Sequence, residues 1–173
     1  EFFSDKPKFE SAKFTAFGMT RRPGRSASND PGLAALIEAK ADAICFVAKS
    51  SAYQVRVALE TTNEENLASI RDSVAAAKAA GREVMGDCEH FFDGYKEDPA
   101  YALATLEAAF RGGADTLVLC DTNGGSLPEE VYAITKAVAP RLPGVPARIH
   151  PHNDAVLAVA NALAAVRAGA THV

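Results

Sequence analysis

Two histidines separated by one residue, His150 and His152, close an apolar run that has the composition of a buried β-strand. Side chains two apart in a strand point to the same face of the sheet. The two imidazoles can therefore face a common point, and paired neutral imidazoles suit a divalent metal ion. A His-x-His pair also occurs as two unrelated polar residues at a strand end, so the rest of the chain has to decide between these interpretations.

The other apolar runs also end in distinctive residues, most of them polar or titratable. The first run ends in Gly18, and the next ones end in Lys49, in Asp87 with Glu89, and in Asp121 with Thr122. In parallel α/β folds, binding and catalysis gather where the strands end at their carboxyl termini. A structural protein has little reason to place such groups at consecutive strand ends, so the pattern favours an enzyme.

The elements that would position these residues alternate along the chain. Strands are expected over residues 13–18, 43–48, 83–90, 116–120 and 147–152, with a last one beginning at residues 171–173. Helices are expected over residues 31–40, 64–80, 99–110, 128–139 and 155–168. Residues 1–9 resemble the tail of a helix already under way.

Helix-start signals support these boundaries. Asp30 and Asp98 each precede a proline, which is a cap followed by a residue suited to the first turn. Thr62 with Glu65 and Ser126 with Glu129 have the spacing of capping boxes. Either residue of the pair Asn153-Asp154 could cap the helix that follows the histidines.

Apolar strands that alternate with helices indicate an α/β fold with a parallel sheet covered on both faces. Two architectures fit: an open doubly wound sheet and a (β/α)₈ barrel. No GxGxxG or Walker A loop follows any strand, which weakens the nucleotide-binding open sheet.

The bulk composition is ordinary for a soluble globular unit of 173 residues, 48% hydrophobic and 23% charged. A net charge of -4 gives no sign of a nucleic-acid partner, and no apolar run approaches the ~20 residues of a membrane span. The mixed, charged start does not have the pattern of a signal peptide. Three cysteines, an odd number in apolar runs, indicate reduced buried thiols in a cytoplasmic protein, and the absence of CxxC argues against a zinc-thiolate site.

The candidate residues suggest a metal-assisted reaction. Two imidazoles leave positions open on Mg²⁺ or Mn²⁺, where a 2-oxo acid could chelate and have its carbonyl polarised. Glu89 could act as a general base or orient a water, or it could be a solvated loop carboxylate. Thr122 could hydrogen-bond a substrate carboxylate, or it could be a turn hydroxyl. Lys49 could be an ion-pair partner or a substrate clamp, Asp121 reads as a turn residue, and the cysteines read as packing.

Several longer motifs resemble a known family. They are Glu-His-Phe-Phe-Asp-Gly-Tyr-Lys at 89–96, Leu-Cys-Asp-Thr-Asn-Gly-Gly at 119–125, His-Pro-His-Asn-Asp-Ala at 150–155 and Leu-Ala-Val-Ala-Asn at 157–161. Over nearly the whole chain they resemble the citramalate synthase branch of the 2-isopropylmalate synthase family, among the HMG-CoA lyase-like metal-dependent (β/α)₈ barrels. The His-x-His-Asn-Asp motif is shared across that superfamily. The 89–96 run and Thr-Arg-Arg-Pro at 20–23 are more particular to the branch.

The resemblance implies roles for individual residues. His150 and His152 would be metal ligands for Mg²⁺ or Mn²⁺, with Zn²⁺ as the alternative. Glu89 would do acid/base work, and Thr122 would bind the carboxylate of the 2-oxo acid. Acetyl-CoA would lose a methyl proton, its enolate would attack the keto carbon of pyruvate, and thioester hydrolysis would release CoA and (R)-citramalate on a route to isoleucine. The resemblance also implies a homodimer when the protein is full length.

The chain departs from the family pattern in places. Pro151 stands where cysteine is usual, and Gly86 and Cys88 replace the expected neighbours of Asp87, which affects the pocket lining and the choice of 2-oxo acid. The Arg-Asp pair of the family's first strand has no counterpart here, and a (β/α)₈ barrel needs about 250 residues. Residues 1–173 are therefore expected to be a partial catalytic barrel domain covering about strands three to eight, with weak or no activity alone.

Alternatives remain open from the sequence. One is the same condensation on another 2-oxo acid, as in 2-isopropylmalate or homocitrate synthase. Another is a carbon-carbon lyase of the HMG-CoA lyase type. A third is a noncatalytic barrel fragment that only binds metal or assembles.

Overall fold

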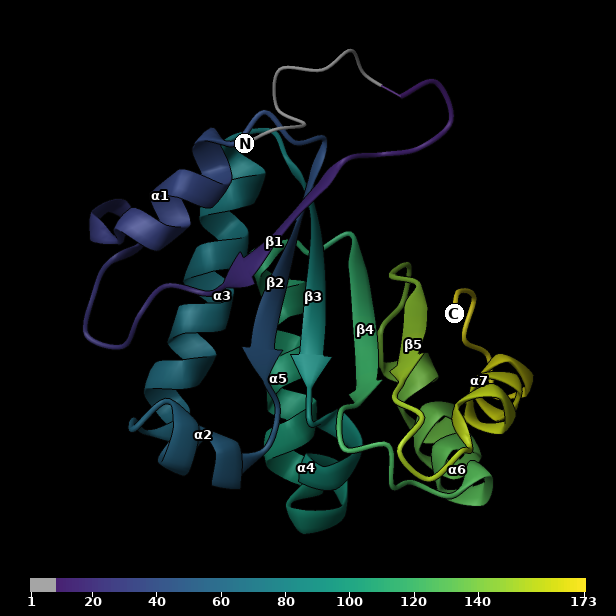
Figure 1. Ribbon diagram of the computed structural model, residues 1–173. Helices are drawn as coiled ribbons and strands as arrows, with labels where there is room; N and C mark the ends of the chain where they lie inside the picture. Colours follow the sequence, from purple (N-terminus) through teal and green to yellow (C-terminus); the bar gives the residue numbers. More distant parts are fainter. Residues whose placement is uncertain (1–8) are drawn as a thin grey trace.

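The computed structural model describes residues 9–173, and it places five parallel strands side by side in sequence order (Figure 1). The strands are β1 (Thr15–Met19), β2 (Ala43–Lys49), β3 (Glu83–Glu89), β4 (Thr116–Asp121) and β5 (Ala147–Pro151). A doubly wound sheet reverses its strand order at a switch point, whereas a (β/α) barrel does not. The unbroken order therefore identifies this sheet as part of a barrel.

Helices occupy every connection between neighbouring strands, and a further helix follows β5. They are α1 (Pro31–Glu38), α2 (Ala52–Ala58), α3 (Asn63–Ala79), α4 (Phe91–Glu97), α5 (Pro99–Gly112), α6 (Pro128–Val138) and α7 (Ala158–Arg167), with short 3₁₀ turns η1 (Ala27–Asn29) and η2 (Ala139–Arg141). Within residues 9–173 no helix combines the length and the hydrophobicity that a membrane crossing requires.

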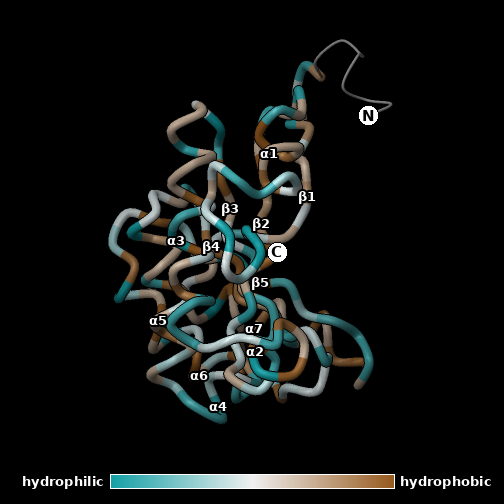
Figure 2. The backbone as a smooth tube through the Cα atoms, turned by 90° about the vertical axis from the view of Figure 1, so that its left-hand side faces the viewer, coloured by the Kyte–Doolittle hydropathy of each residue, from teal (hydrophilic) through white to brown (hydrophobic). Residues whose placement is uncertain are grey.

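The core lies between the sheet and the helices. Strand residues with fully buried side chains, such as Phe46, Leu117 and Leu119, pack in one cluster with residues of α3, α5 and α6. Figure 2 shows hydrophobic and hydrophilic segments alternating along the backbone, in the helices as well as near the strands. The other face of the sheet carries Phe17 and Met19, which are 62% and 43% exposed, so part of this inner face is open to solvent.

The end of the described chain makes a short contact beside β5. His172 forms an isolated parallel bridge with Arg148, and the N–H of Ile149 donates to the carbonyl of His172 at 3.1 Å. Of the last strand predicted at residues 171–173, the structure therefore shows a single bridge at His172 and no named strand. The prediction of a helix tail over residues 1–9 falls almost entirely outside the described residues.

Several helix starts differ in detail from the sequence prediction. Thr62 caps α3, but the Glu65 side chain bonds Arg21 instead of closing a capping box. The capping box predicted at Ser126 and Glu129 is wrong by one residue, because Glu130 accepts from the N–H of Leu127. The Ser126 hydroxyl donates to Asp121 instead.

The helix after the histidines starts later than predicted. Helix α7 begins at Ala158, so the prediction of a start at Ala155 is wrong. The prediction that Asn153 or Asp154 caps it is also wrong, because Leu157 holds the N-cap position without a side-chain cap bond. Asn153 Oδ1 still accepts a hydrogen bond from the N–H of Ala158 at 3.1 Å. Helices α2 and α4 had no sequence prediction. Both are seven residues long, and such short helices are stabilised by packing rather than by propensity.

Candidate active site

The carboxyl ends of β2 to β5 are joined one to the next by hydrogen bonds and an ion pair. The ammonium of Lys49 on β2 pairs with the carboxylate of Glu89 on β3. The N–H of His90, just beyond β3, donates to Thr122 Oγ1 at 2.7 Å. The N–H of His152 donates to the carbonyl of Asp121 on β4 at 3.1 Å. The predicted residues therefore lie along one edge of the sheet.

Glu89 and Lys49 form a half-buried ion pair, with side chains 23% and 16% exposed. The ladder pairs these two residues directly across β2 and β3, so both side chains point to the inner face. Of the two roles open for Lys49, the structure favours the ion-pair partner. The pair places a carboxylate at the barrel edge with a fixed cation beside it.

His90 makes a sharp exit from β3 into α4. Its φ is 57°, a left-handed conformation that is uncommon outside glycine. The turn brings its N–H to Thr122, and burial, with the positive charge of Lys49, lowers the pKa of the His90 imidazole. Strained backbone of this kind clusters at functional sites, although the contact itself shows only that β3 and β4 are locked together here.

The turn after β4 brings Thr122 close to the histidine segment. Asp121 was predicted to be a turn residue, but it is the last residue of β4; it is buried and accepts hydrogen bonds from the N–H and hydroxyl of Ser126 in the turn that follows. Gly124 has a φ of 61°, and a Cβ there would lie 2.7 Å from a carboxylate oxygen of Asp154. Glycine therefore lets the two loops touch.

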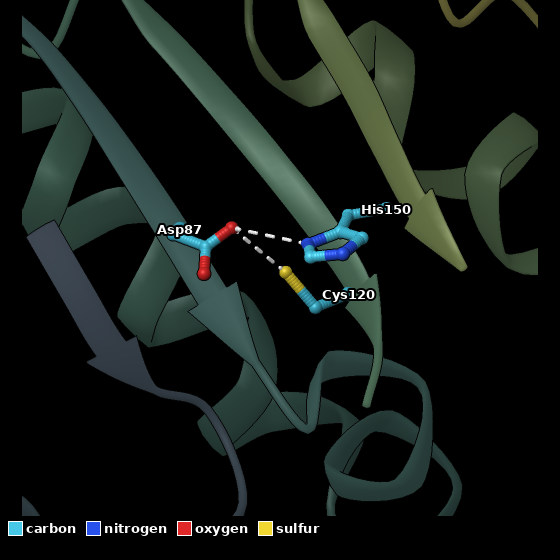
Figure 3. Close-up of side chains that lie close together, drawn as sticks. All are labelled: Asp87, Cys120 and His150. Carbon is cyan, nitrogen blue, oxygen red and sulfur yellow. Dashed lines mark hydrogen bonds and ion pairs between the residues drawn. The ribbon is translucent and has the colours of Figure 1, made fainter. Parts of the chain in front are cut away.

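His150 and His152 have ring centroids 5.0 Å apart with planes inclined by 58°. His150 also lies close to two buried residues, Asp87 on β3 and Cys120 on β4 (Figure 3). Asp87 Oδ1 lies 4.0 Å from His150 Nδ1 and accepts a hydrogen bond from the thiol of Cys120 at 3.0 Å. The three side chains come from β3, β4 and β5 and point toward one another.

Burial controls the ionisation of this group. It raises the pKa of the Asp87 carboxyl, while the Cys120 thiol and His150 act in the opposite direction. Burial and the charge of Asp87 raise the pKa of the Cys120 thiol well above its usual range. The thiol is therefore protonated at neutral pH and acts as a hydrogen-bond donor.

The donor atoms fit a divalent ion. One ligand atom each from Asp87, Cys120 and His150 lies within 4.8 Å of the others, and His152 presents a second imidazole beside His150. Of the four residues proposed from the sequence, only His150 belongs to this group; His152, Glu89 and Thr122 lie along the same edge.

Sequence reasoning missed part of this arrangement. Asp87 was noted at its strand end but given no role, and Cys120 was read as packing. Cys120 is buried as predicted, Cys45 is only partly buried, and all three cysteines are unpaired thiols. The signal that could have found the cluster is the alternation along three strands, which puts residues 87, 120 and 150 on one face.

Comparisons with known proteins agree with the fold and with the motifs. The HMGL-like family model matches residues 23–173. An (R)-citramalate synthase of Aquifex aeolicus is 52% identical over 97% of this chain and 32% of its own length. An (R)-citramalate synthase of Streptomyces coelicolor is 48% identical over 100% of this chain and 33% of its own length. The chain thus spans about a third of the curated relatives it matches.

More distant relatives carry other names. A homocitrate synthase of Sulfolobus acidocaldarius and a probable 2-isopropylmalate synthase of Methanopyrus kandleri are 34% and 36% identical, covering 78% and 80% of this chain and 28% and 27% of their own lengths. Among solved structures, an HMG-CoA lyase from Bacillus subtilis superimposes with a TM-score of 0.81 at 20% identity, over 98% of this chain and 55% of that one. This likeness confirms the predicted fold, a partial (β/α)₈ barrel. By its sequence and its fold, the chain belongs to the HMGL-like family.

Proposed function

We propose that the protein carrying this chain condenses acetyl-CoA with pyruvate to give (R)-citramalate and CoA. The observation that carries the proposal is the alignment of Glu89, Thr122, His150 and His152 along one edge of a barrel sheet, in a chain 52% identical to an (R)-citramalate synthase. A divalent ion, Mg²⁺ or Mn²⁺ before Zn²⁺, held by His150 and His152 would supply Lewis-acid polarisation of the keto group.

The chain's own residues would do the rest. The carboxylate of Glu89, held by Lys49, would take the methyl proton of acetyl-CoA or orient the water that later hydrolyses the thioester. The acetyl carbon bonds to the keto carbon, the keto oxygen gains a proton, and water replaces CoA. Since Thr122 Oγ1 accepts from the N–H of His90, its own hydrogen remains free to donate to the substrate carboxylate.

We propose pyruvate rather than a larger 2-oxo acid as the substrate because the relatives named citramalate synthase are 45% to 52% identical to this chain. The relatives named homocitrate synthase or 2-isopropylmalate synthase are 33% to 36% identical. The motif at residues 89–96 supports the same choice. We further propose that the full-length protein works as a homodimer.

The test is a CoA-thiol release assay on the full-length protein with acetyl-CoA and a panel of pyruvate, 2-oxoisovalerate and 2-oxoglutarate. The proposal expects pyruvate to give the highest kcat/KM, and it expects activity to disappear on chelation and return with Mg²⁺ or Mn²⁺. A preference for another acid would assign the chain to that synthase. Acetyl-CoA production from a hydroxyacyl-CoA, without condensation, would assign the lyase reaction.

A further inference from the structure

Cys120 stands in an unusual place for a thiol that only packs. It lies on the inner face of the sheet and is buried between β3 and β5. Its thiol donates a hydrogen bond to the carboxylate of Asp87, and the imidazole of His150 lies close by (Figure 3). A thiol, a carboxylate and an imidazole from three adjacent strands form the donor set of a borderline-soft metal ion such as Zn²⁺.

We propose that Asp87, Cys120 and His150 form a second metal position, selective for thiophilic divalent ions such as Zn²⁺ and Co²⁺. Because it uses His150, this position excludes simultaneous binding of a hard ion by the His150–His152 pair. The inference shares that residue with the proposed function but does not rest on the condensation reaction.

The distances between the ligand atoms of Asp87, Cys120 and His150 are close to those around a tetrahedral zinc ion. Bonds of about 2.3 Å to sulfur and about 2.0–2.2 Å to nitrogen and oxygen, at tetrahedral angles, require ligand atoms roughly 3.4–3.6 Å apart. The sulfur lies 3.0 Å from Asp87 Oδ1, and His150 Nδ1 lies 4.0 Å from the same oxygen. One distance is short and the other long by about half an ångström, so small side-chain rotations would complete the site.

Access and selectivity follow from the burial of the three residues. Asp87 and Cys120 are only 6% and 2% exposed, so an ion would reach them from the side of His150, near the carboxyl end of β5, and keep a water as its fourth ligand. Binding would release the thiol proton to solvent. Mg²⁺ prefers six oxygen ligands and gains little from sulfur, so it would not compete for this position.

The experiment is a Co²⁺ titration of the full-length protein, followed by its absorption spectrum. Ligation by Cys120 predicts a sulfur-to-cobalt charge-transfer band in the near ultraviolet. The band is expected to vanish in Cys120→Ser, and to persist in Cys45→Ser, a matched control because Cys45 lies on the same face. It is also expected to persist in His152→Ala, which removes the hard-ion pair but not this ligand set.

Zinc X-ray absorption of the wild-type protein gives a measurement that needs no variant. One sulfur at about 2.3 Å is expected at one equivalent of Zn²⁺. A spectrum with only nitrogen and oxygen ligands, or a cobalt band of equal strength in Cys120→Ser and wild type, would overturn the proposal. Failure of the condensation assay alone would leave it standing, since neither spectrum depends on turnover.

Discussion

At the scale of single residues, hydrogen bonds decide what each polar group at the barrel edge can still do. The Thr122 hydroxyl accepts one hydrogen bond and its own hydrogen remains available, whereas the Cys120 thiol already donates its hydrogen to Asp87. Glu89 is held in place by one cation, Lys49, beside solvent. The Thr122 hydroxyl can therefore still donate to a carboxylate, whereas the Glu89 carboxylate can accept a proton.

Glu89→Gln is expected to lower kcat by about 10²–10⁴-fold, because an amide cannot accept the proton. Metal binding should be unchanged, since the imidazoles are untouched. Steady-state thiol release measures the effect. Glu107→Gln is the control, because Glu107 is an exposed carboxylate paired with Arg111 and should have wild-type activity. Equal rates for wild type and Glu89→Gln would remove Glu89 from the chemistry.

Thr122→Val is expected to raise the KM for pyruvate by about 10- to 150-fold, since one hydrogen bond to a charged group contributes roughly 1.5–3 kcal/mol. The KM for acetyl-CoA should change little. Thr122→Ser keeps the hydroxyl and should restore the pyruvate KM. If serine and valine behaved alike, the hydroxyl would be structural only, as the partner of the His90 N–H.

At the scale of elements, caps and close contacts hold the strand ends in position. Asp30 caps α1 by accepting from the N–H of Leu33 at 2.8 Å, and it also accepts from the N–H of Arg22. Helix α4 packs its buried pair Phe91 and Phe92 beneath the edge, with ring centroids 5.9 Å apart.

Asp30→Ala is expected to destabilise the full-length protein by about 1 kcal/mol through the lost cap. Burial opposes ionisation of Asp30, but backbone N–H bonds outweigh it and lower its pKa. The stabilisation is therefore fully present above the unfolded value of about 3.9 and is lost as the pH falls through the lower folded value. Urea unfolding at pH 7 and pH 3 should show the difference between Asp30→Ala and wild type shrink in acid; a difference that grew would contradict this.

Gly94→Ala is expected to destabilise the protein by about 1–3 kcal/mol, because its Cβ would lie 2.0 Å from the backbone oxygen of Ser50 and force α4 away from the end of β2. Gly125→Ala is the matched control, since a Cβ there meets nothing within 4 Å. Chemical denaturation compares the two. Equal stabilities would mean that α4 does not press against this strand end.

The sequence predicted the features that follow from local patterns of residues. It missed the features that depend on contacts between segments distant in the chain. The strands, the long helices and the His150–His152 pair follow from local periodicity and spacing. Helices α2 and α4, the left-handed turn at His90 and the Asp87–Cys120–His150 cluster arise only when neighbouring strands align. Glu65 shows the same limit, because its capping role was overridden by Arg21 from another strand end.

At the scale of the whole molecule, the sheet has one covered and one partly open face. Phe17, Met19 and the His150 side chain are exposed on the inner side, where a complete barrel would bury them. We expect the isolated 173-residue chain to show little or no condensing activity. Comparison of its thiol-release rate with that of the full-length protein checks this, and equal rates would refute it.

The central claim is tested most directly by identifying the product formed by the full-length protein from acetyl-CoA, ¹³C-labelled pyruvate and Mg²⁺. Nuclear magnetic resonance of the mixture, with chiral chromatography, should show (R)-citramalate and free CoA in equal amounts. The double variant His150→Ala/His152→Ala should give none. Unchanged labelled pyruvate with the wild-type protein, or undiminished citramalate with the double variant, would contradict the proposed metal-assisted condensation.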